Sequence, residues 1–334
     1  MRNTVENKEE KQVENTLRPH SFDEFYGQNS LKENLRVYIN AAKKRQEALD
    51  HVLVYGPSGL GKTTIAHVIA KELGQKLVTV NGPTIEKIGD MASILSSLDP
   101  GDILFIDEVH RLPKVVEEFL YQAMEDFKIN VLISHDKDSQ NLGIDLPPFT
   151  VVAATTKVSS LSWPLRQRFG INFKFDFYKV EEIENIIKRS AQVLGNKIDA
   201  ESAHEIAIRS RGTPRIANRL LRRVRDFSTN EGKKMITIRL TNDALKRIGV
   251  DQIGLDEIDV MYLSQLIYRF KGGPVGLETL ASSFSEDPGT LEEISEPYLL
   301  SIGFINRTPR GREITPKGKD YFLKYHKDCV SKRI

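Results

Sequence analysis

The stretch that decides the fold is His51-Val-Leu-Val-Tyr-Gly-Pro-Ser-Gly-Leu-Gly-Lys-Thr-Thr64. It opens with an apolar run, Val52 to Tyr55, that predicts a buried strand, and an apolar-periodic helix is expected from Ile65 to Leu73. Between them stands a Gly-rich loop with G-x-x-x-x-G-K-T spacing. A Gly-rich turn alone is weak evidence, but strand, full spacing and helix in this order predict a phosphate-binding loop.

The residues of this loop have separate roles in nucleotide binding. The glycines let backbone N–H groups approach phosphate oxygens, with the positive end of the helix behind them. Lys62 is expected to reach the β and γ phosphates of ATP, and the Thr63 hydroxyl is expected to ligate Mg²⁺. The predicted cofactor-binding residues of the loop are Gly56, Gly59, Leu60, Gly61, Lys62, Thr63 and Thr64.

Composition sets the general class of the protein. A net charge of +2 is close to neutral, so partners have to be sought in the local distribution of charge. The single cysteine, Cys329, excludes an intramolecular disulfide and a cysteine-rich zinc site, and we expect a reducing cytoplasm. Residues 1–15 have no apolar core, so we expect a disordered leader there rather than a signal peptide or membrane anchor.

Two acidic residues follow a second buried strand. Ile103 to Ile106 is a continuous apolar run of the kind found in central parallel strands, and it ends in Asp107 and Glu108. Alone, the pair would be read as two surface acids. Because it stands 45 positions after Lys62 and parallel strands present ligand sites at their carboxyl ends, we interpret it as a Walker B pair. Asp107 would hold the Mg²⁺ shell, and Glu108 would polarise the attacking water.

Three further polar residues are weaker candidates. Thr155 closes a buried strand from Phe149, where it could bond a γ-phosphate or its attacking water, although strand-end threonines often serve structure alone. Arg166 and Arg168 precede a Phe-Gly stop with a spacing that does not serve one helix face. Either arginine could also be simply solvated.

Residues 128–146 predict a hairpin, with strands from Lys128 to Ser134 and from Leu142 to Asp145-Leu146. One face of it is apolar. An ordinary edge hairpin and a docking surface for another protein fit the pattern equally well.

From Lys179 the sequence turns helical, which predicts a small all-α unit after an α/β unit. A turn, Arg211-Gly-Thr-Pro-Arg215, opens an arginine-rich helix, and seven arginines without any acid lie between Arg209 and Arg225. The strong local field could meet phosphate from a nucleotide, phosphate from nucleic acid, or neither.

The last part of the chain predicts a winged helix, with three helices and a two-strand ribbon tipped by Pro-Arg-Gly. Its charge is divided: residues 255–299 carry two Lys/Arg and nine Asp/Glu, whereas residues 300–334 carry nine and three. The ribbon lies in the basic half. Arg307, Arg310 and Arg312 are therefore candidate DNA phosphate contacts, and the basic tail beyond Lys324 is expected to be solvated.

Together these features resemble the AAA+ ATPases and, within them, the bacterial Holliday junction branch-migration motors, over roughly residues 16–325. The resemblance implies a P-loop parallel sheet with a small helical lid and a C-terminal winged helix. We expect a large ATPase domain at 16–178, a lid at 179–252 and a winged helix at 253–330. The matching segments are Leu17-Arg-Pro, Asp50-His-Val-Leu, Gly59-Leu-Gly-Lys-Thr-Thr, Leu104-Phe-Ile-Asp-Glu-Val-His-Arg-Leu, Ala123-Met-Glu-Asp-Phe, Asp145-Leu-Pro-Pro-Phe-Thr, Arg211-Gly-Thr-Pro-Arg-Ile-Ala-Asn-Arg-Leu-Leu-Arg-Arg-Val-Arg-Asp and Arg307-Thr-Pro-Arg-Gly-Arg.

The same resemblance implies residue roles and partners. Thr155 matches sensor 1, Arg215 matches sensor 2, and Arg168 matches an arginine finger supplied to the neighbouring subunit of a hexameric ring, with Arg166 the weaker candidate. Arg18 and Tyr178 match positions beside the adenine. The implied partners are duplex DNA at Holliday junctions and the junction-binding protein RuvA at the hairpin of residues 128–146, with RuvC as a further candidate. The implied activity is ATP-driven DNA translocation during recombination and repair.

Two departures from the family pattern stand out. The loop reads Gly-Pro-Ser-Gly instead of Gly-Pro-Pro-Gly, outside the phosphate-contacting positions, and the hairpin tip, residues 134–141, lacks the usual small, Gly-containing sequence. The departure at the tip bears on docking to RuvA, whereas the departure in the loop leaves phosphate binding unaffected. The alternatives are a clamp loader, which would end in a helical collar, and a DNA-binding regulator that uses nucleotide only as a switch.

Overall fold

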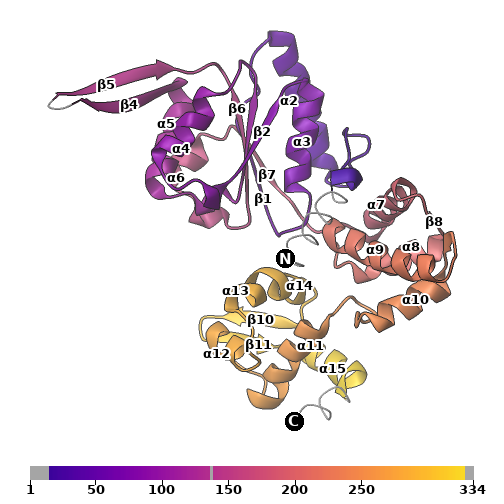
Figure 1. The fold of residues 1–334 in the computed structure, drawn as a ribbon. Helices are drawn as coiled ribbons and strands as arrows, with labels where there is room; N and C mark the ends of the chain where they lie inside the picture. The colour runs from indigo at the N-terminus through magenta and orange to yellow at the C-terminus, as the bar shows by residue number, and fades with distance from the viewer. Residues whose placement is uncertain (1–14, 136–137, 328–334) are drawn as a thin grey trace. The chain divides into compact units, whose positions relative to one another are not determined.

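The computed structural model describes residues 15–135 and 138–327, and of residues 131–142 only the backbone. Cys329 lies outside the described residues, and so do residues 1–14 of the leader expected at residues 1–15. The chain divides into two compact units, residues 1–178 and 179–334. Figure 1 shows the ribbon of both units, coloured along the chain.

The first unit is built on a five-stranded parallel sheet. Its strand order is β2 (Leu77–Asn81), β3 (Ile103–Asp107), β6 (Thr150–Thr155), β1 (Val52–Tyr55) and β7 (Ile171–Lys174). The three inner strands are buried almost throughout, as their apolar runs predict, because helices cover both faces of such a sheet. The parallel P-loop sheet expected from the sequence is confirmed, whereas β7 was not predicted.

Helices lie on both sides of this sheet (Figure 1). On one side are α2 (Asn29–Arg45) and α3 (Lys62–Leu73); on the other are α4 (Ile88–Ser96), α5 (Lys114–Asp126) and α6 (Trp163–Gln167). The core on the α4–α6 side joins apolar side chains of β3 and β6 to those of the helices, among them Leu104, Leu120, Val151 and Leu165. Short 3₁₀ turns at 82–84, 109–111 and 158–160 follow three strand or loop ends.

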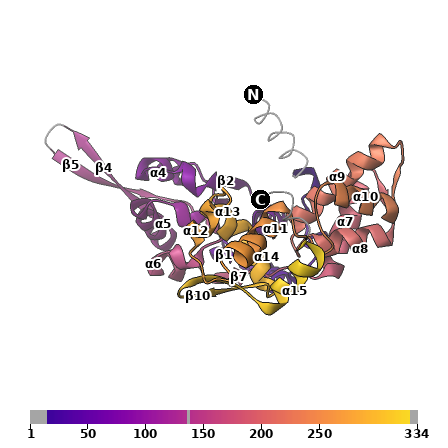
Figure 2. The same ribbon diagram turned by 90° about the horizontal axis from the view of Figure 1, so that it is seen from below.

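The predicted hairpin is present and longer than expected. Strands β4 (Lys128–His135) and β5 (Asp138–Asp145) pair antiparallel, with Lys128 opposite Asp145. Both views show the ribbon projecting well beyond α5 (Figure 2). Its base is tied to the unit, because Ile129 is buried in the core.

The first part of the second unit has four helices, α7 (Val180–Val193), α8 (Ala200–Arg209), α9 (Pro214–Asn230) and α10 (Ile238–Arg247). The expectation of an all-α unit is wrong in one respect. Lys197–Ile198 (β8) and Met235–Ile236 (β9) form a short parallel pair. Two-residue strands are too short to show the alternation of apolar and polar residues that predicts a strand, so the sequence did not indicate them.

The second part of this unit carries the winged helix. Its order is α11 (Glu257–Ser264), a π-helical turn (Gln265–Arg269), α12 (Leu277–Ser282), α13 (Pro288–Thr290), a second π-helical turn (Leu291–Ser295), α14 (Glu296–Ser301), β10 (Ile305–Thr308), β11 (Gly311–Ile314) and α15 (Pro316–Tyr325). A separate core includes Tyr262, Leu280 and Phe322. An isolated antiparallel bridge joins Val275, before α12, to Arg312 of strand β11. Among the described residues no helix has the length and hydropathy needed to cross a membrane.

Candidate functional site

The sheet order brings three predicted site segments together. Strand β6 lies between β3 and β1, so the carboxyl ends of these strands are neighbours. Those ends carry Asp107, Thr155 and the Gly56 loop in turn. Crevices at the carboxyl ends of parallel strands are where open α/β sheets bind ligands. Residues separated by about a hundred positions thus share one edge of the sheet.

The phosphate loop has a geometry that only its glycines permit. Gly56 has a φ of 143°, and a Cβ there would lie 2.5 Å from the carbonyl oxygen of Phe175. Lys62 begins α3 and is only 8% exposed. Its Nζ donates to the carbonyl oxygens of Gly56 and Pro57, at 2.9 and 2.8 Å. The ammonium group is therefore held inside the loop, where phosphate oxygens would replace these carbonyls.

Thr63 and Asp107 make a pair of oxygen ligands suited to Mg²⁺. The Thr63 hydroxyl donates to Oδ2 of Asp107 at 3.2 Å, which brings the helix start and the end of β3 together. Mg²⁺ prefers oxygen ligands and keeps several waters, taking one or two protein groups plus substrate phosphates. The two residues fit the ion.

Glu108 stands in a constrained position beside Asp107. Its backbone is left-handed, with φ 50° and ψ 44°, a conformation that costs a non-glycine residue about 1–3 kcal/mol and is concentrated at functional sites. A Cβ on Gly82 would approach the Glu108 carbonyl to 2.5 Å, so a glycine is needed there. The carboxylate is 39% exposed and pairs with Arg111 at 3.2 Å. Arg111 engages Oε2 of this carboxylate, whose partial exposure leaves it able to exchange this partner for a water molecule.

Thr155 is more deeply embedded than its expected role suggests. It is 1% exposed, and a 2.9 Å hydrogen bond joins its hydroxyl to Nδ1 of His110. The same hydroxyl accepts from the Lys157 N–H at 3.0 Å. His110 is a site residue that the sequence did not single out, since only the neighbouring of β3 and β6 brings it to Thr155.

The expected adenine side also has an ordered arrangement. The Arg18 guanidinium bonds Nε2 of His67 at 2.9 Å, and the Tyr178 hydroxyl donates to the Leu60 carbonyl at 2.9 Å. Burial, with the nearby Arg18 charge, lowers the pKa of His67. A neutral imidazole can accept the arginine proton. Arg18, in the segment before α2, therefore contacts helix α3. Tyr178, at the end of the unit, contacts the phosphate loop.

The two arginines of the finger segment point to different partners. Arg168 ion-pairs with Glu125 in the last turn of α5, and its Nε is buried without a hydrogen-bond partner. Arg166 lies 6.0 Å from the ring centre of Trp163, which is 66% exposed. Glu125 was not predicted, because it lies 43 positions away in sequence. An unsatisfied buried donor on Arg168 is a feature that native structures rarely keep without a reason.

Arg215 belongs to the other unit. It is the second residue of α9, directly after Pro214, and its side chain is exposed. A cation at a helix start opposes the helix dipole, so the position is not one that helix stability favours. Its expected role as sensor 2 stays a prediction.

The winged-helix arginines are divided by their partners. Glu296 is fully buried and accepts hydrogen bonds from Tyr262 Oη, Arg307 Nε and Arg312 Nε, at 2.9, 2.7 and 2.9 Å. Arg312 is only 17% exposed, while Arg307 keeps 42%. Arg310, at the ribbon tip, is exposed and has no ion pair or hydrogen bond from its side chain within the described part of the chain. Arg310 is therefore the ribbon arginine most available to a phosphate.

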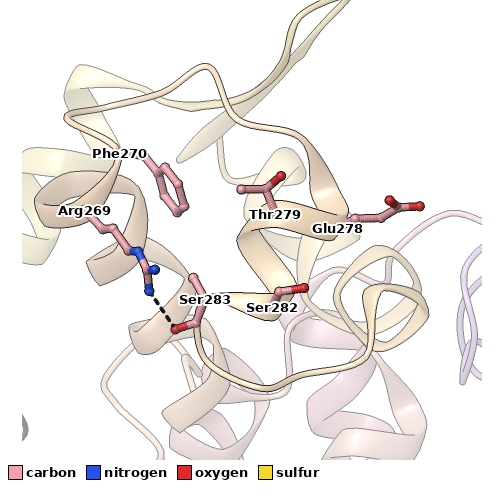
Figure 3. Close-up of a pocket in the computed structure, with 6 residues that line it drawn as sticks. All are labelled: Arg269, Phe270, Glu278, Thr279, Ser282 and Ser283. Atoms are coloured by element: carbon pink, nitrogen blue, oxygen red, sulfur yellow. Dashed lines mark hydrogen bonds between the residues drawn. The ribbon is translucent and has the colours of Figure 1, made fainter.

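One shallow hollow lies on the winged helix (Figure 3). Phe270 and Thr279 face each other across it, and Arg269 donates to the Ser283 carbonyl at 3.2 Å. The remaining lining residues are Glu278 and Ser282. The arginine bond is to backbone and exposed, so the hollow is not a preformed charged site.

Comparison with known proteins identifies all three parts of the chain. Residues 17–175 match the model of the Holliday junction DNA helicase RuvB P-loop domain, residues 178–251 the RuvB AAA lid domain, and residues 252–323 the RuvB C-terminal winged-helix domain. The chain is 52% identical over 315 residues to the Holliday junction branch migration complex subunit RuvB of Acholeplasma laidlawii, covering 94% of each.

Other relatives agree. The subunit from Lacticaseibacillus casei is 52% identical over 314 residues, covering 94% of this chain and 93% of that protein. A solved structure of the Thermotoga maritima RuvB Holliday junction branch migration motor superposes with a TM-score of 0.85 at 49% identity, covering 93% of this chain and 99% of the other. With the phosphate loop, the carboxylates of β3 and the winged helix already in place, these matches show that the chain belongs to the RuvB family of AAA+ ATPases.

Proposed function

We propose that this chain is the ATP-hydrolysing DNA motor of a Holliday junction branch-migration complex. One observation carries the proposal: Lys62, Thr63, Asp107 and Glu108 converge at one sheet edge in a chain that ends in a winged helix. The first group supplies phosphate binding and hydrolysis. The winged helix supplies a surface for duplex DNA.

Hydrolysis would proceed through groups already near their working positions. Lys62 would exchange its two carbonyl partners for β- and γ-phosphate oxygens, and Thr63 and Asp107 would hold Mg²⁺. The ion, when bound, neutralises charge developing on the phosphates. Glu108, once free of Arg111, accepts a proton from the attacking water, and Thr155 orients that water or the γ-phosphate. Arg18 and Tyr178 line the adenine side.

In P-loop ATPases an arginine that reaches the γ-phosphate stabilises the charge of the transition state. We assign that role to Arg168 of a neighbouring copy, with Arg166 as the weaker choice, and the sensing of the bound nucleotide to Arg215. An arginine supplied in trans stabilises transition-state charge and makes hydrolysis depend on assembly. A closed hexameric ring would complete every site, because heterologous contacts of this kind form rings.

Contact with DNA would be made through phosphates. Arg310 at the ribbon tip and the exposed part of Arg307 suit backbone contacts, which position a protein without reading sequence. Arg312 would act mainly by holding the ribbon. We further propose that RuvA docks on the β4–β5 hairpin and that RuvC joins the complex at the junction.

Two other uses of the same core are less well supported. A clamp loader carries a helical collar, whereas residues 252–323 of this chain match a RuvB winged-helix domain. A regulator that uses nucleotide only as a switch would not need both Glu108 and a finger arginine.

The test is branch migration of a synthetic four-way junction with ATP, Mg²⁺ and purified RuvA. We expect wild type to separate the junction into duplexes, and Glu108→Gln to bind ATP and DNA without moving the junction. Hydrolysis by wild type without any junction movement, with RuvA shown to be bound, would refute the motor function while leaving the ATPase intact.

A further inference from the structure

A buried arginine joins the lid to the winged helix within the second unit. Arg211 stands in the turn between α8 and α9 and is 5% exposed. Its guanidinium contacts residues beyond the lid. One NH2 group pairs with Asp256 Oδ2 at 2.9 Å and with Asp259 Oδ2 at 2.6 Å. Its Nε donates to the Gly254 carbonyl at 2.7 Å. A side chain of the lid is thus held by the linker and by the first turn of α11.

Backbone contacts close the same junction from the linker side. Gly254 has a φ of 90°, and a Cβ there would lie 2.4 Å from the Arg209 carbonyl oxygen. Arg209 in turn is bonded by Glu205 and Asn242 within the lid. The linker therefore lies directly on the end of α8, with no room for a side chain between them.

Side chains of the winged helix also hold the linker in place. The Tyr298 ring lies 5.3 Å from the Arg211 guanidinium carbon, and its hydroxyl donates to the Ile253 carbonyl at 2.6 Å. Asp251 accepts from Tyr321 and bonds His326 of the C-terminal segment, both at 2.9 Å. The linker at 250–256 is consequently clamped from α14, α15 and the lid.

Such an ionic junction is a poor way to gain stability but a good way to fix an angle. Removing the Arg211 guanidinium and the Asp259 carboxylate from water costs free energy that their attraction only offsets with good geometry, whereas the Asp256 side chain stays 32% exposed. A planar, forked guanidinium accepts only particular directions of approach, unlike an apolar contact, which permits sliding. Arg211 also stands four positions before Arg215, in the turn that starts α9.

We propose that Arg211 is a positioning residue that locks lid and winged helix into one body, so that a displacement of the α9 start during the ATP cycle is delivered undiminished to the DNA-binding ribbon. The proposal rests on the proposed motor function. It concerns the efficiency of coupling and not the chemistry, since Arg211 is buried and its guanidinium is taken up by Asp256 and Asp259.

The first test measures the joint directly in the full chain. Spin labels are placed at the exposed positions Thr229 of the lid and Lys319 of α15, in a Cys329→Ser background. We expect one narrow distance distribution, the same with ADP and with a non-hydrolysable ATP analogue, and a broad one for Arg211→Met. A broad distribution in the parent, one that shifts with nucleotide, or an equally narrow one in Arg211→Met would overturn the proposal.

The second test measures ATP consumed per base pair of junction migrated. For Arg211→Met we expect a rate of ATP hydrolysis within about twofold of wild type. The ATP consumed per base pair should rise about fivefold or more, which corresponds to the lower end of typical coupling free energies. Arg211→Lys, which keeps the charge and can still fold, should restore the ratio in part.

A matched control and a clear contrary result complete this test. Arg223→Met removes an exposed arginine of α9 that pairs with Asp226 at 3.1 Å. It should leave the ATP consumed per base pair unchanged. An Arg211→Met ratio equal to that of wild type would contradict the proposal. If wild type moves no junction at all, the motor function fails, and the label distances still decide whether the joint exists.

Discussion

Two clusters of charge in this molecule are each centred on a glutamate, and they are used in opposite ways. At the sheet edge of the first unit, Glu108 is 39% exposed and ion-pairs with Arg111. In the winged helix, Glu296 is fully buried and receives Tyr262 and both Arg307 and Arg312. One carboxylate can change partners during a reaction, whereas the other is committed to holding the fold.

The difference explains why a run of arginines is a weak guide to ligand binding. Three arginines of the ribbon fall within six residues and are alike in sequence. Only the structure separates them, since a buried carboxylate needs cationic partners to be tolerated and takes two of the three. An arginine is available to a ligand only when its charge is not already required inside the chain.

The largest effect should follow Glu108→Gln. Loss of the group that accepts the proton from water should lower ATP hydrolysis by about 10²- to 10⁴-fold. Nucleotide affinity and melting temperature should stay near those of wild type, because Glu108 is half exposed and packs no core. Steady-state hydrolysis with DNA is the measurement, and Glu118→Gln, an exposed carboxylate on α5, is the matched control. Unchanged hydrolysis would remove Glu108 from the reaction.

Glu296→Ala should affect the fold instead. Leaving two arginines without their buried carboxylate should destabilise the winged helix by about 3–5 kcal/mol. Because several domains unfold separately, amide hydrogen exchange in α11 and β10 reports this better than a single melting curve. Glu278→Ala, an exposed carboxylate of the same domain, should stay within about 0.5 kcal/mol. Normal exchange protection in Glu296→Ala would show that the buried cluster is not structural.

Arg310→Ala should weaken DNA binding by about tenfold without disturbing the fold, as expected for loss of about one phosphate contact. The slope of log affinity against log salt should fall by about 0.9. Arg312→Ala makes the contrast, because it should lose exchange protection in the ribbon as well. Equal salt slopes for wild type and Arg310→Ala would exclude Arg310 from the phosphate contacts.

The smallest effect concerns pH and His51, a partly buried residue directly before β1. Burial lowers the pKa of His51, and its Nδ1 accepts from the Val151 N–H at 2.9 Å, which requires a neutral ring. The unfolded chain, with a histidine pKa near 6.5, then binds more protons than the folded one below that pH.

Stability of the first unit should therefore fall as pH drops through 6.5, by at most about 1.4 kcal/mol per pH unit from this group. Hydrogen exchange of β1 and β6 amides at pH 7 and 5.5 measures it, and His51→Gln should flatten the difference. A steeper loss in His51→Gln than in wild type would reverse the assignment.

Much of the fold follows from local pattern. The apolar runs of β1, β3 and β6 announce a parallel sheet, because strands buried on both faces need no polar residue, and that expectation is confirmed. Strand β7 escaped prediction, since its Ile-Asn-Phe-Lys sequence at the sheet margin mixes polar and apolar residues. Its identity as a strand comes from pairing with β1, more than a hundred residues earlier.

The site divides in the same way. The residues that a phosphate and a metal ion demand are marked by spacing along the chain, so Lys62, Thr63 and Asp107 could be named in advance. Their supporting partners could not: His110 lies 45 positions from Thr155, and Glu125 lies 43 from Arg168. Such pairs depend on which strands and helices become neighbours, and no local period encodes that.

The most direct test of the proposed motor asks whether its catalytic site is shared between two copies of the chain. Arg168→Ala and Lys62→Ala are each assayed for DNA-stimulated ATP hydrolysis, alone and as an equimolar mixture of matched total concentration. Random mixing in a ring would give about a quarter of interfaces with both an intact loop and an intact arginine. We predict that the mixture recovers part of the activity that neither variant has alone. No recovery, with mixed rings shown to assemble normally, would contradict a finger supplied by the neighbouring subunit.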